Sequence, residues 1–355
     1  MTAGIGNANA KYLISYLGNP ENVYNAGKKQ LSQVPGIGEK VIKAIQKKEC
    51  LKKAESIVKE CEKKNIEIIY YTEDRYPGLL KGILDAPNVI YFQGTGDLNP
   101  PRSISIVGTR KATDYGKSIV KQLIHPLHIL KPTIFSGLAY GIDIEAHKEA
   151  LTTDIPTFAV LAGGLDKIYP GLHIPLAEKM IANKGGIISE YPPGTIPEAH
   201  NFPARNRIIA GISESTIVIE AARKGGALIT ADIAHSYNRE VFAVPGDIGN
   251  PFSEGCNQLI RDQKALILTS ENDLYYQLNW DLTSDLHKKK KLAYENLSGE
   301  EQAVLSTLED YKGTLAIDEL AWRSQVNITQ LASILLNLEF KGIVKSLPGK
   351  KYSIV

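Results

Sequence analysis

Residues 103–110 read Ser103-Ile-Ser-Ile-Val-Gly-Thr-Arg110, a β-branched apolar run that ends in a glycine turn carrying a hydroxyl and a guanidinium group. Six more short apolar runs follow, mostly separated by helix-length segments, at 133–135, 157–161, 186–189, 216–219, 240–244 and 265–268. Continuous β-branched runs of this length are typical of strands buried on both faces. Alternation with helices predicts an α/β fold with a mostly parallel, doubly wound sheet. In such sheets ligands bind beyond the carboxyl ends of the strands.

Glycine turns lie at those predicted strand ends. The first is Gly108-Thr109-Arg110, the second begins Ser136-Gly137, the third is 162–166, and the fourth runs from Lys224 to Thr230. Main-chain N–H groups at a helix start bind phosphate, and an arginine side chain adds a bidentate contact to it. Tight backbone geometry alone explains any single turn equally well. Four such turns at one sheet edge favour a shared anionic ligand.

Several catalytic signatures are missing from the chain. It has no Gly-x-Gly-x-x-Gly, no Gly-x-x-x-x-Gly-Lys-Ser/Thr, no Gly-x-Ser-x-Gly and no His-Glu-x-x-His. Cys50, Cys61 and Cys256 lack the spacing of metal ligands. These absences give no support to a dinucleotide enzyme or a P-loop ATPase, and we expect no metal and no cofactor. A secretory segment and a membrane-length apolar run are also missing, so we expect a soluble, cytoplasmic protein without membrane contact.

The segments that flank the sheet have signatures of their own. Residues 1–64 hold 12 lysines and repeat a Gly-Ile-Gly tripeptide at 4–6 and 36–38, which predicts a helical helix-hairpin-helix (SAM-like) domain. Hairpin amides of this kind hold nucleic-acid phosphates, but a packing role is equally open. Residues 279–295 are a predicted linker, and 296–355 have the helix-turn-helix spacing and hairpin of a winged-helix domain. Its second helix, 329–340, lacks Arg and Lys, which argues against sequence-specific duplex binding.

An ordered set of motifs carries a resemblance along nearly the whole chain. It includes Asp74-Arg-Tyr-Pro77, Ile106-Val-Gly-Thr-Arg110, Phe135-Ser-Gly-Leu-Ala-Tyr-Gly-Ile-Asp143, Phe202-Pro-Ala-Arg-Asn-Arg-Ile-Ile-Ala-Gly211 and Arg239-Glu-Val-Phe-Ala-Val-Pro-Gly246. Together they resemble the DNA-processing protein A family (DprA, also called Smf). The resemblance implies a DNA-binding protein that is not an enzyme, and an extended Rossmann-like domain, here 65–278, that binds single-stranded DNA. It also implies a homodimer that protects incoming DNA and loads the RecA recombinase during natural transformation.

The resemblance also implies a site. Its strand-binding pocket is built around the first two glycine turns, here Gly108, Thr109, Arg110, Ser136 and Gly137. Further candidates for the pocket or its support are Arg205, Arg207, Gly226 and Thr230. Such turns track a strand through its phosphates without reading its sequence.

Some residues near these turns have two open interpretations. Tyr140, Tyr169 and Phe202 are placed either to stack on bases or to pack in the core. Asp143 and His147 are one helical turn apart, and we interpret them as a hydrogen-bonded structural pair rather than an acid/base pair. The chain also has His173 and Gly171 where the family more often has Asn and Lys.

Two alternatives use the same fold. A LOG-type nucleotide phosphoribohydrolase needs Arg and Glu around a Pro-Gly-Gly-x-Gly-Thr turn, and 224–228 lacks the Pro, the third Gly and the Glu. A nucleotide-sensing Rossmann protein would use the turns for a small ligand and the outer domains for proteins.

Overall fold

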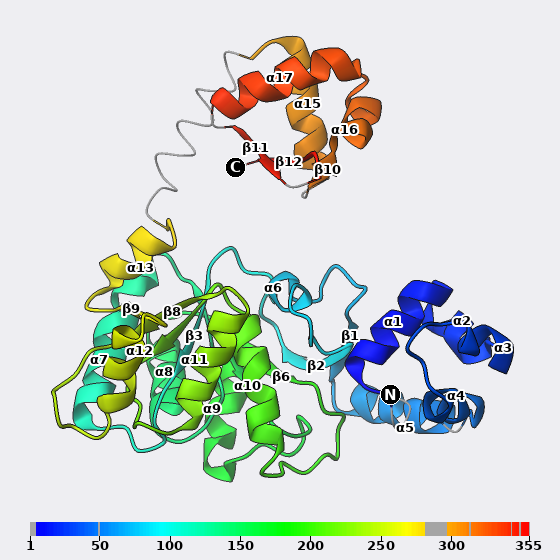
Figure 1. Ribbon diagram of the computed structural model, residues 1–355. Helices are drawn as coiled ribbons and strands as arrows, with labels where there is room; N and C mark the ends of the chain where they lie inside the picture. The colour runs from blue at the N-terminus through cyan, green and yellow to red at the C-terminus, as the bar shows by residue number, and fades with distance from the viewer. Residues whose placement is uncertain are drawn as a thin grey trace. The chain divides into compact units, whose positions relative to one another are not determined.

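The chain divides into two compact units in a computed structural model, Met1–Leu274 and Tyr275–Val355. The structure describes residues 5–48, 50–280, 297–311, 314–341, 343–347 and 349–354 (Figure 1). The finer domain boundaries at 64/65, 278/279 and 295/296 stay predictions.

A nine-stranded sheet forms the centre of the first unit. Its strands are β1 (Glu67–Tyr70), β2 (Val89–Gly94), β3 (Ser103–Val107), β4 (Thr133–Ser136), β5 (Thr157–Val160), β6 (Gly186–Ser189), β7 (Ser215–Val218), β8 (Glu240–Ala243) and β9 (Leu266–Ile267). They are ordered β1-β2-β6-β5-β4-β3-β7-β8-β9. The seven strands from β6 to β9 in this order pair in parallel, which confirms the predicted mostly parallel sheet. β1 and β2, which pair antiparallel and extend the sheet beyond β6, were not predicted.

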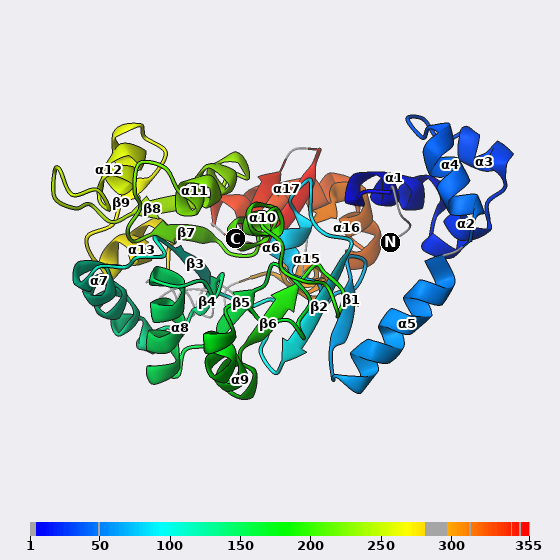
Figure 2. The same cartoon turned by 90° about the horizontal axis from the view of Figure 1, so that it is seen from below.

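Helices cover both faces of this sheet (Figure 2). α7 (Asp114–Ile124), α8 (Ile142–Thr152) and α9 (Ile174–Ala182) lie on one face. α10 (Asn201–Gly211), α11 (Gly226–Ser236) and α12 (Glu254–Arg261) lie on the other. β3 to β7 are buried along their whole length, because each is apolar or hydroxyl-bearing throughout and has a helix layer on either side. The unit also contains the short helix α6 (Gly78–Lys81), and α13 (Glu271–Gln277) spans the division between the units.

The strand order changes direction next to β3. From β3 the chain adds β4, β5 and β6 on one side, and then crosses through α10 to add β7, β8 and β9 on the other. The connections that leave the carboxyl ends of β3 and β7 therefore run in opposite directions. That divergence opens a crevice at the edge of the sheet, the usual ligand position in open α/β folds.

Five helices precede the sheet: α1 (Asn7–Leu17), α2 (Pro20–Asn25), α3 (Lys28–Ser32), α4 (Glu39–Gln46) and α5 (Cys50–Lys63). The second predicted hairpin lies between α3 and α4, where Gly36 has a φ of +76° and Gly38 is the N-cap of α4. Ile42 on α4 is buried in the small core of this region. Gly4 of the first hairpin lies outside the described residues, and α1 begins directly after Gly6.

The second unit is a winged helix, as predicted. Its helices are α15 (Gly299–Asp310), α16 (Ile317–Ser324) and α17 (Ile328–Phe340), and its strands β10 (Leu315–Ala316), β11 (Val344–Leu347) and β12 (Lys351–Ile354) form a β10-β12-β11 sheet. Ser298 and Glu301 form the capping box that starts α15. Most of the predicted linker, from 281 onward, lies outside the described residues. Over the described parts of the chain, no helix has the length and apolarity needed to cross a membrane.

Candidate nucleic-acid interface

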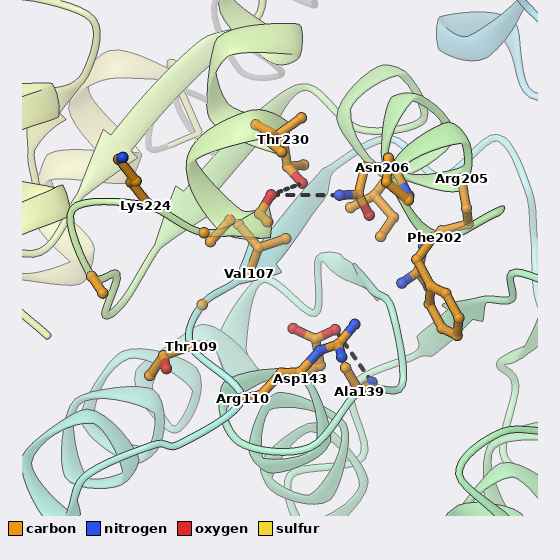
Figure 3. Close-up of a pocket in the computed structure, with 18 of the residues that line it drawn as sticks. Val107, Thr109, Arg110, Ala139, Asp143, Phe202, Arg205, Asn206, Lys224 and Thr230 are labelled. Carbon is orange, nitrogen blue, oxygen red and sulfur yellow. Dashed lines mark hydrogen bonds between the residues drawn. The ribbon is translucent and has the colours of Figure 1, made fainter. Parts of the chain in front are cut away.

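A cavity of about 730 Å³ lies at the crevice beside β3 and β7 (Figure 3). Its wall combines the turn after β3, the start of α8, the first half of α10 and the turn that leads into α11. The lining residues are Val107, Gly108, Thr109, Arg110, Ala139, Asp143, Tyr169, Pro197, Ala199, Phe202, Pro203, Arg205, Asn206, Ile209, Ala222, Lys224, Gly225, Gly226, Ala227, Ile229 and Thr230. Six of the nine predicted site residues are among them. Ser136, Gly137 and Arg207 are not.

The turn after β3 is held by a buried carboxylate. Glu220 is 1% exposed and directly follows the end of the β7 region, and its side chain accepts hydrogen bonds from the backbone N–H (2.9 Å) and hydroxyl (2.5 Å) of Thr113. The backbone N–H of Thr109 donates to the Glu220 carbonyl at 2.7 Å. A Cβ on Gly108 would lie 2.4 Å from Cγ1 of Ile142, so only glycine allows α8 to approach this closely. The turn is therefore rigid, while Arg110 extends from it into solvent.

The start of α11 forms the opposite wall. Gly225 is the N-cap of α11 and Gly226 its first residue, and the first turn of the helix carries no acidic side chain. The Gly226 carbonyl accepts hydrogen bonds from Thr230 Oγ1 at 3.0 Å and Asn206 Nδ2 at 3.4 Å, which join α11 to α10 (Figure 3). The unpaired N–H groups of this helix start carry a partial positive charge. With the exposed Lys224 beside it, this wall is suited to an anion.

A buried arginine and a buried aspartate support the floor of the cavity. Arg205 is 4% exposed, and its Nη1 donates to the carbonyls of Gly137 (2.8 Å) and Val160. Burial lowers the pKa of Arg205 to about 10, and the charge of Asp143 opposes that shift. Burial raises the pKa of Asp143, against the effect of Arg205 and of hydrogen bonds that include the Ala139 N–H at 3.3 Å. The structure thus places Arg205 as a brace beneath the pocket.

Gly137 leaves room for the Arg205 and Asp143 side chains and does not line the cavity. A Cβ there would lie 2.7 Å from both terminal nitrogens of Arg205 and from Oδ2 of Asp143. Ser136 is fully buried, and its hydroxyl donates to the Ile106 carbonyl at 2.6 Å, which ties β4 to β3. Both residues lie under the pocket and not in its wall.

Arg207 points away from the cavity. Residues two apart on a helix face nearly opposite sides, so α10 cannot present both Arg205 and Arg207 to one ligand. Arg207 instead donates to Glu190 and lies 3.8 Å from Asp85. Burial raises the pKa of Glu190, and the Arg207 charge acts in the opposite direction. DNA contact by Arg205 and Arg207 stays a prediction; in the structure Arg205 donates to main-chain carbonyls and Arg207 pairs with Glu190.

Two of the three aromatic residues lie at the mouth of the pocket. Tyr169, which is 55% exposed, meets the Phe202 ring edge-on with 5.9 Å between centroids. The Arg110 guanidinium lies 5.6 Å from the centroid of the Phe202 ring. Tyr140 lies elsewhere, edge-on to His173 at 4.9 Å. An aromatic surface beside a cation matches what an unstacked base and its phosphate require.

The interpretation of Asp143 and His147 as a hydrogen-bonded pair was wrong. Asp143 turns toward Ala139 and Arg205, whereas Nδ1 of His147 lies 2.7 Å from the Thr157 hydroxyl. Since that hydroxyl donates to the Ile134 carbonyl, Nδ1 must be the donor toward it. Burial lowers the pKa of His147 to about 3, so the ring is neutral and structural.

Two wall residues, Asn206 and Lys224, were not among the predicted site residues. Asn206 occupies the middle of the Arg205-Asn206-Arg207 motif and is the member of the three that joins α10 to α11. Lys224 stands directly before the glycine pair of the fourth turn. Its position in a predicted phosphate turn was the available signal.

Comparison with known proteins gives the family. The model of the DNA recombination-mediator protein A family matches residues 67–279, which is more than half of the chain. The chain belongs to this family. A DprA winged-helix domain model matches 288–350, and a SAM-like helix-hairpin-helix tandem model matches 2–48.

Similar proteins agree with this placement. Protein Smf of Synechocystis sp. is 34% identical over 98% of this chain and 95% of its own. The structure of DprA from Streptococcus pneumoniae superposes with a TM-score of 0.67 at 32% identity, over 78% of this chain and 94% of that one. DNA processing protein A from Helicobacter pylori, solved for its unique single-stranded DNA binding mode, gives a TM-score of 0.55 at 28% identity, over 61% and 96%. These matches cover the sheet that carries the candidate site.

Proposed function

We propose that this protein binds single-stranded DNA in the crevice beside β3 and β7 and processes DNA during natural transformation. The observation that carries the proposal is the wall of the 730 Å³ cavity. It places the exposed Arg110 and Lys224, a helix start without acidic residues and the Tyr169–Phe202 pair around one space. Cations and main-chain amides suit phosphates, and exposed rings suit unstacked bases, so this set favours a single strand over a duplex. The Helicobacter pylori relative and its reported single-stranded DNA binding mode support the same ligand.

We propose a binding role without catalysis for this site. Among the described residues that line the cavity, Asp143 is the sole carboxylate, and it faces the Arg205 guanidinium and the Ala139 N–H. A phosphoribohydrolase needs a glutamate at the ribose beside a free arginine. No observation here favours that alternative, and release of adenine from adenosine monophosphate, followed by chromatography, would revive it.

A titration of fluorescent oligothymidylate by anisotropy tests the binding proposal. Arg110→Ala removes one charge-assisted phosphate contact, worth about 1.5–3 kcal/mol, so affinity should fall by about tenfold to a hundredfold. The slope of log K against log salt should become shallower by about 0.7. Lys121→Ala is the charge-matched control, because Lys121 is in the last turn of α7 and does not line the cavity. Equal binding by wild type and Arg110→Ala, or equal affinity for duplex and single strand, would contradict the proposal.

We extend the proposal to partners and location. The family resemblance supports a cytoplasmic homodimer that protects the bound strand and loads RecA onto it. Light scattering of the purified chain tests the dimer, and a monomer at micromolar concentration would count against it. RecA-dependent ATP hydrolysis on a strand already bound by this protein tests loading, and no stimulation over the bare strand would count against it.

A further inference from the structure

A second cavity, of about 470 Å³, adjoins the first on the α7–α8 side of the sheet edge. It is lined by Arg110, Lys111, Ala112, Lys117, Tyr140, Gly141, Ile144, Glu145, Lys148, Leu172, His173 and Leu176. Arg110 lies in the wall of both cavities, so its side chain can contact a ligand in either of them. A strand bound at Arg110 in the first cavity therefore lies next to the second.

The second cavity is rich in cations. Besides Arg110 it presents Lys111 from the turn after β3, Lys117 from α7 and Lys148 from α8. Lys117 lies 3.3 Å from Asp114 and Lys148 lies 2.8 Å from Glu145, both in exposed pairs. Such pairs contribute only about 0–1 kcal/mol each, so a phosphate can compete for these ammonium groups. Four cations against two carboxylates leave a net positive surface.

An apolar shelf borders those cations. Tyr140 is 43% exposed and rests edge-on against His173, with 4.9 Å between ring centroids. His173 is buried, and its Nδ1 lies 2.8 Å from the Leu138 carbonyl, which holds the ring in place under the tyrosine. Leu172, at the same rim, is 81% exposed. An exposed aromatic on a fixed support is the arrangement on which bases stack.

We infer that the second cavity is a further nucleotide-binding subsite, in which Lys117 and Lys148 hold phosphates and Tyr140 stacks on a base of a strand that continues past Arg110. This inference rests on the proposed single-stranded DNA binding. Proteins that bind single strands without sequence preference cover about 4–16 nucleotides per module. The two cavities together supply a track of that kind, whereas the first alone suits the short end of the range.

Oligomer length separates the two subsites experimentally. Oligothymidylates of about 4 and about 12 nucleotides bracket most of that range of site sizes. Each is titrated with the protein at low salt, and binding is followed by anisotropy. The test variant is Lys117→Ala/Lys148→Ala, and the control is Lys121→Ala/Lys179→Ala, which removes two lysines from α7 and α9 outside both cavity walls. Lys224→Ala, which lines the first cavity and not the second, serves as the reference for the proposed function.

The test variant should bind the short oligomer within about twofold of wild type and the long one about tenfold more weakly. Its salt slope for the long oligomer should be shallower by about 1.4, for two lost phosphate contacts. Tyr140→Ala should weaken the long oligomer alone. Equal losses on both lengths, or none on the long one, would overturn the second subsite. If Lys224→Ala leaves both lengths unaffected, or wild type binds neither, the proposed function itself fails.

Discussion

Replacing Glu220 by glutamine tests how the Arg110 turn is held. Both Glu220 oxygens accept hydrogen bonds from Thr113, at 2.9 Å from the backbone N–H and 2.5 Å from the hydroxyl. A glutamine amide has one acceptor, which the backbone N–H occupies. Its NH₂ faces the Thr113 hydroxyl, which accepts the Gly116 N–H at 3.2 Å and can accept once more, but the hydroxyl hydrogen no longer has the carboxylate oxygen as its acceptor. One charge-assisted hydrogen bond is lost at a fully buried position, so Glu220→Gln should lower stability by about 1.5–3 kcal/mol.

Hydrogen exchange of the β3 and β7 amides is the suitable assay, because it reports the opening free energy of this sheet separately from the other unit. The same substitution in a Thr113→Val background, where the hydroxyl is already missing, should cost roughly 1–2 kcal/mol less. Single-strand affinity should fall with Glu220→Gln, since the turn that carries Arg110 loosens. A cost below about 0.5 kcal/mol in both backgrounds would show that this buried contact does not hold the turn.

Three further predictions concern residues around the site. Burial lowers the pKa of the neutral His147 from 6.5 to about 3, so the free energy of unfolding is highest above pH 6.5 and declines as pH falls toward 3. At pH 5, urea titrations should show that wild type has lost about 2 kcal/mol more than His147→Gln, relative to neutral pH. Equal losses would contradict the neutral state of His147. Arg207→Met leaves Glu190 buried without its cation and should destabilise by about 3–5 kcal/mol, with single-strand affinity of the folded protein unchanged; a shallower salt slope would instead place Arg207 on the DNA. Gly108→Ala forces a Cβ to within 2.4 Å of Ile142 and should cost about 1–3 kcal/mol in urea unfolding together with a loss of binding, whereas an unchanged unfolding midpoint would refute the close packing.

The sequence predicted the sheet well because its central strands are buried on both faces. A strand such as Ser103–Val107 has no polar face, so its short β-branched run stands out between helix-length segments. β1 and β2 lie at the edge of the sheet, where β1 is only partly buried, and Glu67 and Tyr70 interrupt the apolar pattern. Their antiparallel pairing depends on contacts between β1 and β2 and between β2 and β6 that no local pattern encodes.

The residues that line the cavity were predicted in part, and the limits have a physical cause. The glycine turns mark their own positions, so Gly108, Arg110 and Gly226 were found from local sequence. Side-chain direction on a helix is decided by rotation and by the neighbours it meets, which is why the two arginines of α10 differ. Arg205 faces the sheet under the pocket, and Arg207 faces Glu190. Local sequence does not report the partners that decide these roles, which are main-chain carbonyls for Arg205 and the Glu190 carboxylate for Arg207.

Photocrosslinking measures most directly where the strand lies. An oligothymidylate carrying 4-thiothymidine is irradiated with the protein, and the attached peptides are identified by mass spectrometry. Binding in the crevice predicts crosslinks at Tyr169 and within 197–206 and 222–230, with Tyr169 and Phe202 as principal sites and a loss of signal in Arg110→Ala. Crosslinks confined to 28–46 or 328–340, with none at the crevice, would place the strand on an outer domain and contradict the site proposed here.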